Sequence, residues 1–178
     1  MSKIGLFYGS ETGKTADAAE KIQEEFGGDG VVEIFDISDC DTSSFDAYDC
    51  LIIGCPTWNI GEIQSDWDGM YGELDDVDFS GKKVAYFGTG DQVGYGDNFQ
   101  DAMGLLEKKI TEKGGTTVGN WPKDDSYEKM MSSKAFLKTP KGEPKIFVGL
   151  ALDEDNQSDL TDERIQKWVA LVKGEFGV

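Results

Sequence analysis

Hydroxyl side chains, glycines and a lysine are crowded into a short stretch near the start of the chain. Lys3–Tyr8 is an apolar run typical of a buried strand, and the residues after it read Gly-Ser-Glu-Thr-Gly-Lys-Thr. A helical pattern follows directly, so loop N–H groups and a helix N-terminus would converge on one point. Ser10, Thr12 and Thr15 add hydroxyl donors. Lys14 adds an ammonium group, and the spacing therefore predicts a site for a phosphate.

Two better-known phosphate motifs fit this loop poorly. The P-loop needs four residues between its glycines, whereas Gly9 and Gly13 enclose three. The dinucleotide fingerprint G-x-G-x-x-G is also absent, because the glycine that follows Gly88-Thr89-Gly90 is Gly94, one residue too late. A nucleotide hydrolase that uses the Gly-Lys-Thr ending stays open as one alternative. An ordinary turn with a Ser/Thr cap stays open as another.

The composition indicates an acidic globular protein. The chain has 178 residues, of which 35 are acidic and 17 basic, and its net charge is −18. Such a surface repels nucleic acids and anionic membranes, and it suits a partner with a basic docking face. We see no apolar run long enough to span a bilayer and no signal peptide, so no stable membrane insertion is expected. The absence of histidine removes the commonest general base and most zinc sites, and we expect neither a catalytic residue nor a metal.

Strand-like and helix-like patterns alternate along most of the chain. The strand-like runs are Lys3–Tyr8, Val31–Asp36, Cys50–Gly54, Lys83–Gly88, Thr116–Gly119 and Ile146–Leu150. Several are apolar throughout, as parallel strands covered on both faces are. Helical patterns cover Ala18–Phe26, Ser65–Tyr71, Phe99–Ile110 and Ile165–Val172. This alternation predicts one α/β domain over residues 1–178, built on a doubly wound sheet.

Capping residues are expected at two of the helices. Thr161 is the expected N-cap of the last helix, and Asp97 followed by Gln100 resembles a capping box for the helix before it. Residues 120–145 break the alternation, since they are polar and hold three prolines and a lysine-rich second half. We expect a long insertion there, which either splits the last strand or leads from one strand to its partner.

Two further loops reach the edge of the sheet where ligands of this fold class bind. Trp58 lies in the loop after the third strand, where it either covers core or offers a stacking platform for a flat aromatic ligand. Tyr95 follows the fourth strand and could form the second wall of the same slot. Asp91 could hydrogen-bond the edge of a heterocycle. The three loops together predict a flat ligand that carries a phosphate.

These residues resemble the long-chain flavodoxins, especially those of cyanobacteria and algae. The resemblance covers essentially the whole chain and rests on Ile4–Gly9 with Thr12–Thr15, Pro56–Glu62, Ser65–Trp67, Phe87–Gln92, Gly94-Tyr95, Asp97–Ala102 and Val148–Gln157. It implies a three-layer fold around a five-stranded parallel sheet in the order 2-1-3-4-5, with the insertion in the last strand. It also implies non-covalently bound FMN.

The resemblance further implies which residues bind the cofactor. The phosphate would lie on Ser10, the Glu11 N–H, Thr12, Gly13, Lys14 and Thr15, with the Glu11 carboxylate pointing away from it. The isoalloxazine ring would lie between Trp58 and Tyr95. The other expected contacts are Thr57, Asn59, Ile60, Gly61, Thr89, Gly90, Asp91, Asn98 and Gln100. A flip of the peptide between Asn59 and Ile60 would let the Asn59 carbonyl accept a hydrogen bond from the reduced flavin.

A low-potential carrier of single electrons is the function that the resemblance implies. It would replace ferredoxin under iron limitation and shuttle electrons between photosystem I and ferredoxin–NADP⁺ reductase in photosynthesis. We expect a monomer in a bacterial cytoplasm, or in a plastid stroma if the source is an alga. An FMN-dependent NAD(P)H:quinone reductase on the same fold is the alternative, which the acidic surface disfavours.

Overall fold

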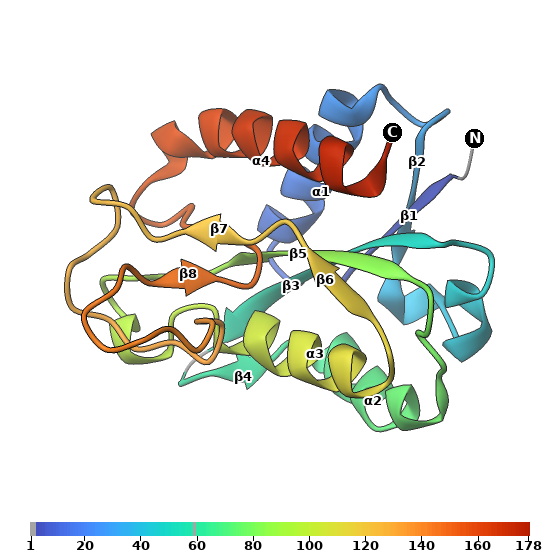
Figure 1. Cartoon of the computed structure of the whole chain (residues 1–178), viewed down its shortest axis with the longest axis horizontal. Helices are drawn as coiled ribbons and strands as arrows, with labels where there is room; N and C mark the ends of the chain where they lie inside the picture. The colour runs from blue at the N-terminus through green and yellow to red at the C-terminus, as the bar shows by residue number, and fades with distance from the viewer. Residues whose placement is uncertain (1–2, 59) are drawn as a thin grey trace.

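Helices cover both faces of a central sheet in the computed structural model, which describes residues 3–58 and 60–178 (Figure 1). α1 (Lys14–Phe26) and α4 (Thr161–Phe176) lie together on one face. α2 (Ser65–Tyr71) and α3 (Asp101–Glu112) lie on the other. The doubly wound α/β fold that the strand–helix alternation predicts, and the three layers that the resemblance implies, are therefore confirmed.

The parallel part of the sheet has the order β2-β1-β3-β5, with β5 followed by β6. These strands are β1 (Ile4–Tyr8), β2 (Val32–Asp36), β3 (Cys50–Trp58), β5 (Lys83–Thr89) and β6 (Thr116–Val118). Successive side chains of a strand point to opposite faces. Ile52 accordingly packs into the core under α1 and α4, and its neighbours Leu51 and Ile53 pack under α2 and α3. The continuous apolar run of β3 thus fills both cores, as predicted.

The last strand is split by the insertion. β6 pairs with the first half of β5, and β9 (Leu150–Leu152) pairs parallel with its second half. Between them the chain leaves the sheet and returns through a short antiparallel pair, β7 (Trp121–Pro122) with β8 (Ile146–Phe147). Of the two alternatives for residues 120–145, the structure selects the split strand.

One expected strand is wrong. The run Ile146–Leu150 divides into β8 and β9, because its first residues bond to the insertion and its last residue bonds to β5. Val148 still donates its N–H to the Ala135 carbonyl at 2.8 Å. At Gly149 the chain lies so close to β5 that a Cβ would stand 2.2 Å from the Tyr86 carbonyl oxygen. A glycine is therefore required where the chain moves from one partner to the other.

Both expected caps are also wrong. α3 follows Gln100, which has a φ of 63° and makes no side-chain cap. Its buried side chain instead donates to the Gly88 carbonyl at 3.2 Å and to the Leu152 carbonyl at 3.0 Å. Thr161 is the first residue of α4, after Leu160 as N-cap, and its hydroxyl donates to Glu154. In both cases the side chain that the local pattern assigned to the cap bonds elsewhere, Gln100 to a carbonyl 52 residues away and Thr161 to a carboxylate seven residues before it.

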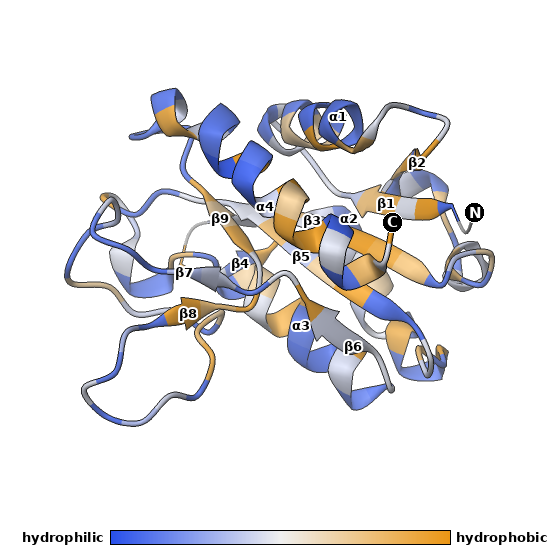
Figure 2. Cartoon of the chain, turned by 45° about the horizontal axis from the view of Figure 1, so that its top comes forward, coloured by the Kyte–Doolittle hydropathy of each residue, from blue (hydrophilic) through white to orange (hydrophobic). Residues whose placement is uncertain are grey.

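The remaining elements are short. β4 (Glu62–Ile63) pairs antiparallel with the end of β3. Single 3₁₀ turns cover Ile37–Asp39, Thr42–Phe45, Glu73–Asp76, Gly96–Asn98 and Ser158–Leu160. Figure 2 shows apolar residues concentrated in the central strands and hydrophilic ones on the outer faces of the helices. Among the described residues, none of the helices combines the length and the apolar character that crossing a membrane requires.

Candidate functional site

One pocket collects residues from the carboxyl ends of β3 and β5 and from the segments that follow β1, β5 and β9. Its volume is about 310 Å³. The residues that line it are Thr12, Lys14, Pro56, Thr57, Trp58, Thr89, Gly90, Asp91, Tyr95, Glu154 and Asp155. All four strands are parallel, so their carboxyl ends meet at the edge of the sheet where such folds bind ligands. The pocket therefore brings the three stretches singled out in the sequence into one place. The expected loop position of Trp58 is wrong, because β3 continues beyond Gly54 and ends at Trp58.

The loop after β1 is positioned by close contact with the start of α2. Gly9 donates its N–H to the Gly54 carbonyl at 3.1 Å. A Cβ on Gly9 would lie 2.1 Å from Gln64 Oε1 and 2.8 Å from Trp67 Cδ1. Gln64 Oε1 also accepts from the Trp67 N–H at 3.2 Å, which holds it in place. Only glycine thus lets the loop begin at this point.

α1 begins with an open N-terminus. Gly13, its N-cap, has a φ of 87° and carries no side chain that could cap the helix. Its own N–H donates to the Ser10 hydroxyl at 3.1 Å, which closes the loop. The first N–H groups of a helix have no intrahelical acceptor, and the helix dipole favours an anion there. This loop is therefore suited to receive a phosphate.

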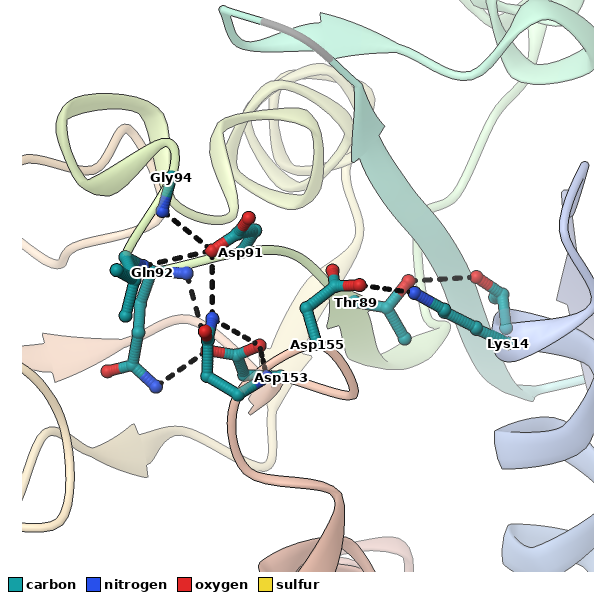
Figure 3. A network of polar contacts seen from close by, with 10 residues as sticks. Lys14, Thr89, Asp91, Gln92, Gly94, Asp153 and Asp155 are labelled. Carbon is teal, nitrogen blue, oxygen red and sulfur yellow. Dashed lines mark hydrogen bonds and ion pairs between the residues drawn. The ribbon is translucent and has the colours of Figure 1, made fainter.

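The hydroxyls and the carboxylate of this loop take different directions. Thr12 lines the pocket. Thr15 is buried, and its Oγ1 lies 3.1 Å from Thr89 Oγ1, a contact drawn in Figure 3. Glu11 Oε1 accepts a hydrogen bond from the Ser65 hydroxyl at 2.7 Å. The Glu11 carboxylate is thus held at the start of α2, which agrees with the expectation that it points away from the phosphate loop's pocket.

Two aromatic side chains line the other part of the pocket. Trp58 ends β3, and its Nε1 is buried without a hydrogen-bond partner among the described residues. Tyr95 is 45% exposed. A buried indole N–H normally finds an acceptor, so its unpaired state fits a pocket whose ligand supplies one. Ile60, another expected contact, is 74% exposed and is not in the pocket lining. Asn59 and the expected peptide flip lie outside the described residues.

A hydrogen-bond network joins the loop after β5 to the turn after β9. Asp91 Oδ1 accepts from the N–H groups of Gly94 at 2.7 Å and Val93 at 3.0 Å, and from Asn156 Nδ2 at 2.8 Å. Asn156 also bonds to the buried Asp153 (Figure 3). The Gly94 N–H lowers the pKa of Asp91 below its ordinary value, with further lowering by Asn156 and Val93 and an opposing effect of burial. The network holds the loop that carries Tyr95.

The stability that the Asp91 network contributes should decrease only when the pH falls below the ordinary Asp pKa of about 4. A group whose pKa is lowered in the folded state stabilises it above the unfolded pKa, and that stabilisation is lost as the pH falls through the folded pKa. The Asp91→Asn variant removes this titration while it keeps one acceptor oxygen. Urea unfolding of the apoprotein between pH 5 and pH 3 should therefore show a shallower loss of stability in the variant. Equal slopes in both proteins would contradict the assignment.

Several expected contact residues lie outside the pocket lining and support it. Gln100 is buried behind the pocket, between β5 and β9. Asn98 Nδ2 donates to Asp101 Oδ2 at 3.1 Å, and a Cβ on Gly61 would lie 2.7 Å from the same oxygen. Thr57 lines the pocket, but its hydroxyl also accepts from the Ala102 N–H at 3.1 Å. These contacts tie the pocket to the start of α3.

Three lining residues, Pro56, Glu154 and Asp155, were not among the predicted contacts. The two acids follow β9, whose carboxyl end reaches the same edge as the other strands. The parallel topology of the last strand could therefore have predicted that these two acids lie at the site.

A larger hollow of about 410 Å³ lies between α1 and β2, but Glu20, Asp29 and Glu33 line it. The described lining of this hollow has no lysine or arginine and no residue of the loop after β1, so the smaller pocket, which has Thr12 and Lys14, is the candidate site.

Comparisons with known proteins point to one family. The family model described as "Flavodoxin" matches residues 6–168. The chain is 64% identical to a flavodoxin of Trichodesmium erythraeum over 100% of both chains. It is 62% identical to a flavodoxin of a Nostoc species, with 99% of this chain and 98% of that protein covered. Flavodoxin from Fusobacterium nucleatum, solved bound to flavin mononucleotide, has a TM-score of 0.86 and 29% identity, with 98% of this chain and 99% of that one covered.

Proposed function

The chain belongs to the flavodoxin family, and from that premise we propose that it carries single electrons at low potential with FMN held non-covalently in the pocket. Members of this family transfer electrons and are not enzymes. The observation that carries the proposal is the union of an open phosphate loop and two aromatic side chains in one pocket. The solved relative bound to flavin mononucleotide supports the same cofactor.

Each part of the pocket has a role in this proposal. Ser10, Thr12, Thr15, the Glu11 N–H and the N-terminus of α1 after Gly13 hold the phosphate, with Lys14 at the rim. Trp58 and Tyr95 enclose the isoalloxazine ring, and the buried Trp58 N–H has its acceptor in the cofactor. The supporting residues Gly61, Asn98 and Gln100 fix the loops around the ring. Residues 1–178 act as one FMN-binding domain.

The negative charge of the protein lowers the redox potential of the bound cofactor. FMN supplies the electron-transfer chemistry, and the protein tunes it through its surroundings. Asp91, Glu154 and Asp155 line the pocket, in a chain of net charge −18. Negative charge added on reduction is repelled by these carboxylates, and the aromatic walls exclude water that would screen it. This repulsion supports a low potential.

The physiological partners that we propose are photosystem I as electron donor and ferredoxin–NADP⁺ reductase as acceptor, in place of ferredoxin when iron is scarce. The cyanobacterial flavodoxins among the similar proteins support this role, and they support a place in the bacterial cytoplasm. The acidic surface supports docking of a monomer on basic partner faces. A plastid stroma is the corresponding place if the source is an alga.

Cofactor content and reactivity test the proposal directly. The purified protein should be yellow and release one FMN per chain on denaturation. It should oxidise NADPH only when the reductase is present, at a rate that falls as the ionic strength rises from about 0.01 M to about 0.15 M, where the Debye length shrinks from about 30 to about 8 Å. Rapid NADPH oxidation by the protein alone would favour the quinone reductase. A colourless protein that cannot be loaded with FMN would exclude both.

A further inference from the structure

Lys14 and Asp155 form an ion pair across the rim of the pocket. Lys14 Nζ lies 2.5 Å from Asp155 Oδ1, and the two side chains are 42% and 46% exposed. Lys14 opens α1, and Asp155 lies in the turn after β9. Figure 3 shows the two side chains pointing toward each other beside Thr89. The one full positive charge of the phosphate loop is therefore already matched by a carboxylate of the same chain.

The charges of the pocket lining make this pair important. Lys14 is the one cation among the described residues that line the pocket. Carboxylates come from Asp91, Glu154 and Asp155. A phosphate that enters thus meets more negative than positive charge, and its attraction comes from hydroxyls and from the N-terminus of α1.

We infer that Asp155 is a positioning residue that weakens the binding of the flavin phosphate. It acts by its own charge and by holding the Lys14 ammonium at the rim. When a phosphate is bound, the Lys14 ammonium interacts with both the phosphate and the Asp155 carboxylate. The attraction between Lys14 and the phosphate is therefore weaker than it would be without Asp155. Asp155 therefore sets the affinity for the phosphorylated end of the ligand and leaves the affinity for the flavin ring unchanged. This inference rests on the proposed function, because it takes FMN as the ligand.

A second ion pair of α1 provides a matched control. Lys21 of α1 and Asp162 in the first turn of α4 lie 2.7 Å apart, Nζ to Oδ1, and each follows its counterpart in the first pair by seven positions. Asp162 is not among the described residues that line the pocket. The Asp162→Asn variant thus removes the same unit charge from the same side of the molecule, but not from the rim.

The test is a titration of three apoproteins, the wild type, Asp155→Asn and Asp162→Asn, with FMN and with riboflavin. Quenching of flavin fluorescence at low ionic strength reports the dissociation constants. For Asp155→Asn the FMN dissociation constant should fall about threefold to tenfold, as expected for one unit charge near a phosphate in a solvated site. Riboflavin affinity should stay within about twofold, because riboflavin carries no phosphate charge. For Asp162→Asn both constants should stay within that range.

Three results would overturn the inference: unchanged FMN affinity in Asp155→Asn, an equal gain for riboflavin, or an equal gain in Asp162→Asn.

A second experiment tests the action through Lys14. In a Lys14→Met background the gain in FMN affinity from Asp155→Asn should be smaller, because only the direct repulsion between Asp155 and the phosphate is then removed. An undiminished gain there would contradict the action through Lys14. If the wild-type apoprotein binds no FMN, the proposed function fails. If it binds FMN and the variants behave alike, the inference alone fails.

Discussion

Riboflavin, which is FMN without its phosphate, should bind the apoprotein at least about a thousandfold more weakly than FMN, because hydrogen bonds to a charged group contribute about 1.5–3 kcal/mol each. The loop offers several such donors, from Thr12 and from the open N-terminus of α1. Loss of two such bonds at about 2 kcal/mol each corresponds to about 4 kcal/mol, which is about a thousandfold because 1.4 kcal/mol is about tenfold in affinity, and any further bond adds to it. Repulsion between the phosphate and the carboxylates that line the pocket offsets only part of this binding free energy. Fluorescence titration of both flavins measures it.

Two variants locate the phosphate and the ring separately. Thr12→Val keeps the side-chain shape and removes a hydroxyl, so FMN should bind about tenfold more weakly while riboflavin is unaffected. Trp58→Ala removes a stacking surface, so both flavins should lose about 1–3 kcal/mol of binding free energy. If Thr12→Val weakened both flavins equally, the phosphate would have to lie elsewhere.

The Gly104→Ala variant should lower the free energy of unfolding by about 2 kcal/mol, because it overpacks the contact between α3 and the insertion. A Cβ on Gly104 would lie 2.3 Å from the Lys134 carbonyl oxygen and 2.4 Å from its carbon. These are backbone atoms, which cannot rotate away as a side chain can. The gain of about 1 kcal/mol in helix propensity offsets only part of the clash. Urea unfolding of the apoprotein measures the difference.

Gly174→Ala in α4 is the matched control for this variant. No atom of residues 3–58 and 60–178 lies within 4 Å of a Cβ at that position, so alanine should stabilise the helix by about 0.5–1 kcal/mol. Lys134, which packs against Gly104, is also connected to the site, because its N–H donates to Asp101 Oδ1 at 2.7 Å. Asp101 in turn accepts from Asn98. Gly104→Ala should therefore weaken FMN binding as well. If both alanines stabilised the protein equally, the insertion would not pack on α3 in solution.

Much of the fold could be predicted because it depends on local patterns. The apolar run around Leu51–Ile53 indicates a strand buried on both faces, and the structure confirms it. The predicted helix Ser65–Tyr71 agrees with α2 to the residue. The local prediction failed where one side chain had two possible partners. Gln100 bonds to the carbonyls of Gly88 and Leu152 across the sheet, and a capping pattern in the sequence contains no information about Leu152.

The sequence by itself determined the fold class and the glycine- and hydroxyl-rich turn before α1, and it placed Trp58 and Tyr95 near the carboxyl ends of two strands. These features depend on residue types and spacings within about one turn or one strand, where backbone preferences act. The tertiary structure alone decided that the insertion splits the last strand, that Glu11 turns toward Ser65, and that Asp155 meets Lys14. Lys14 and Asp155 are 141 residues apart. Their contact depends on the register of β9 beside β5 and on the packing of α1 against the sheet, which no local pattern encodes.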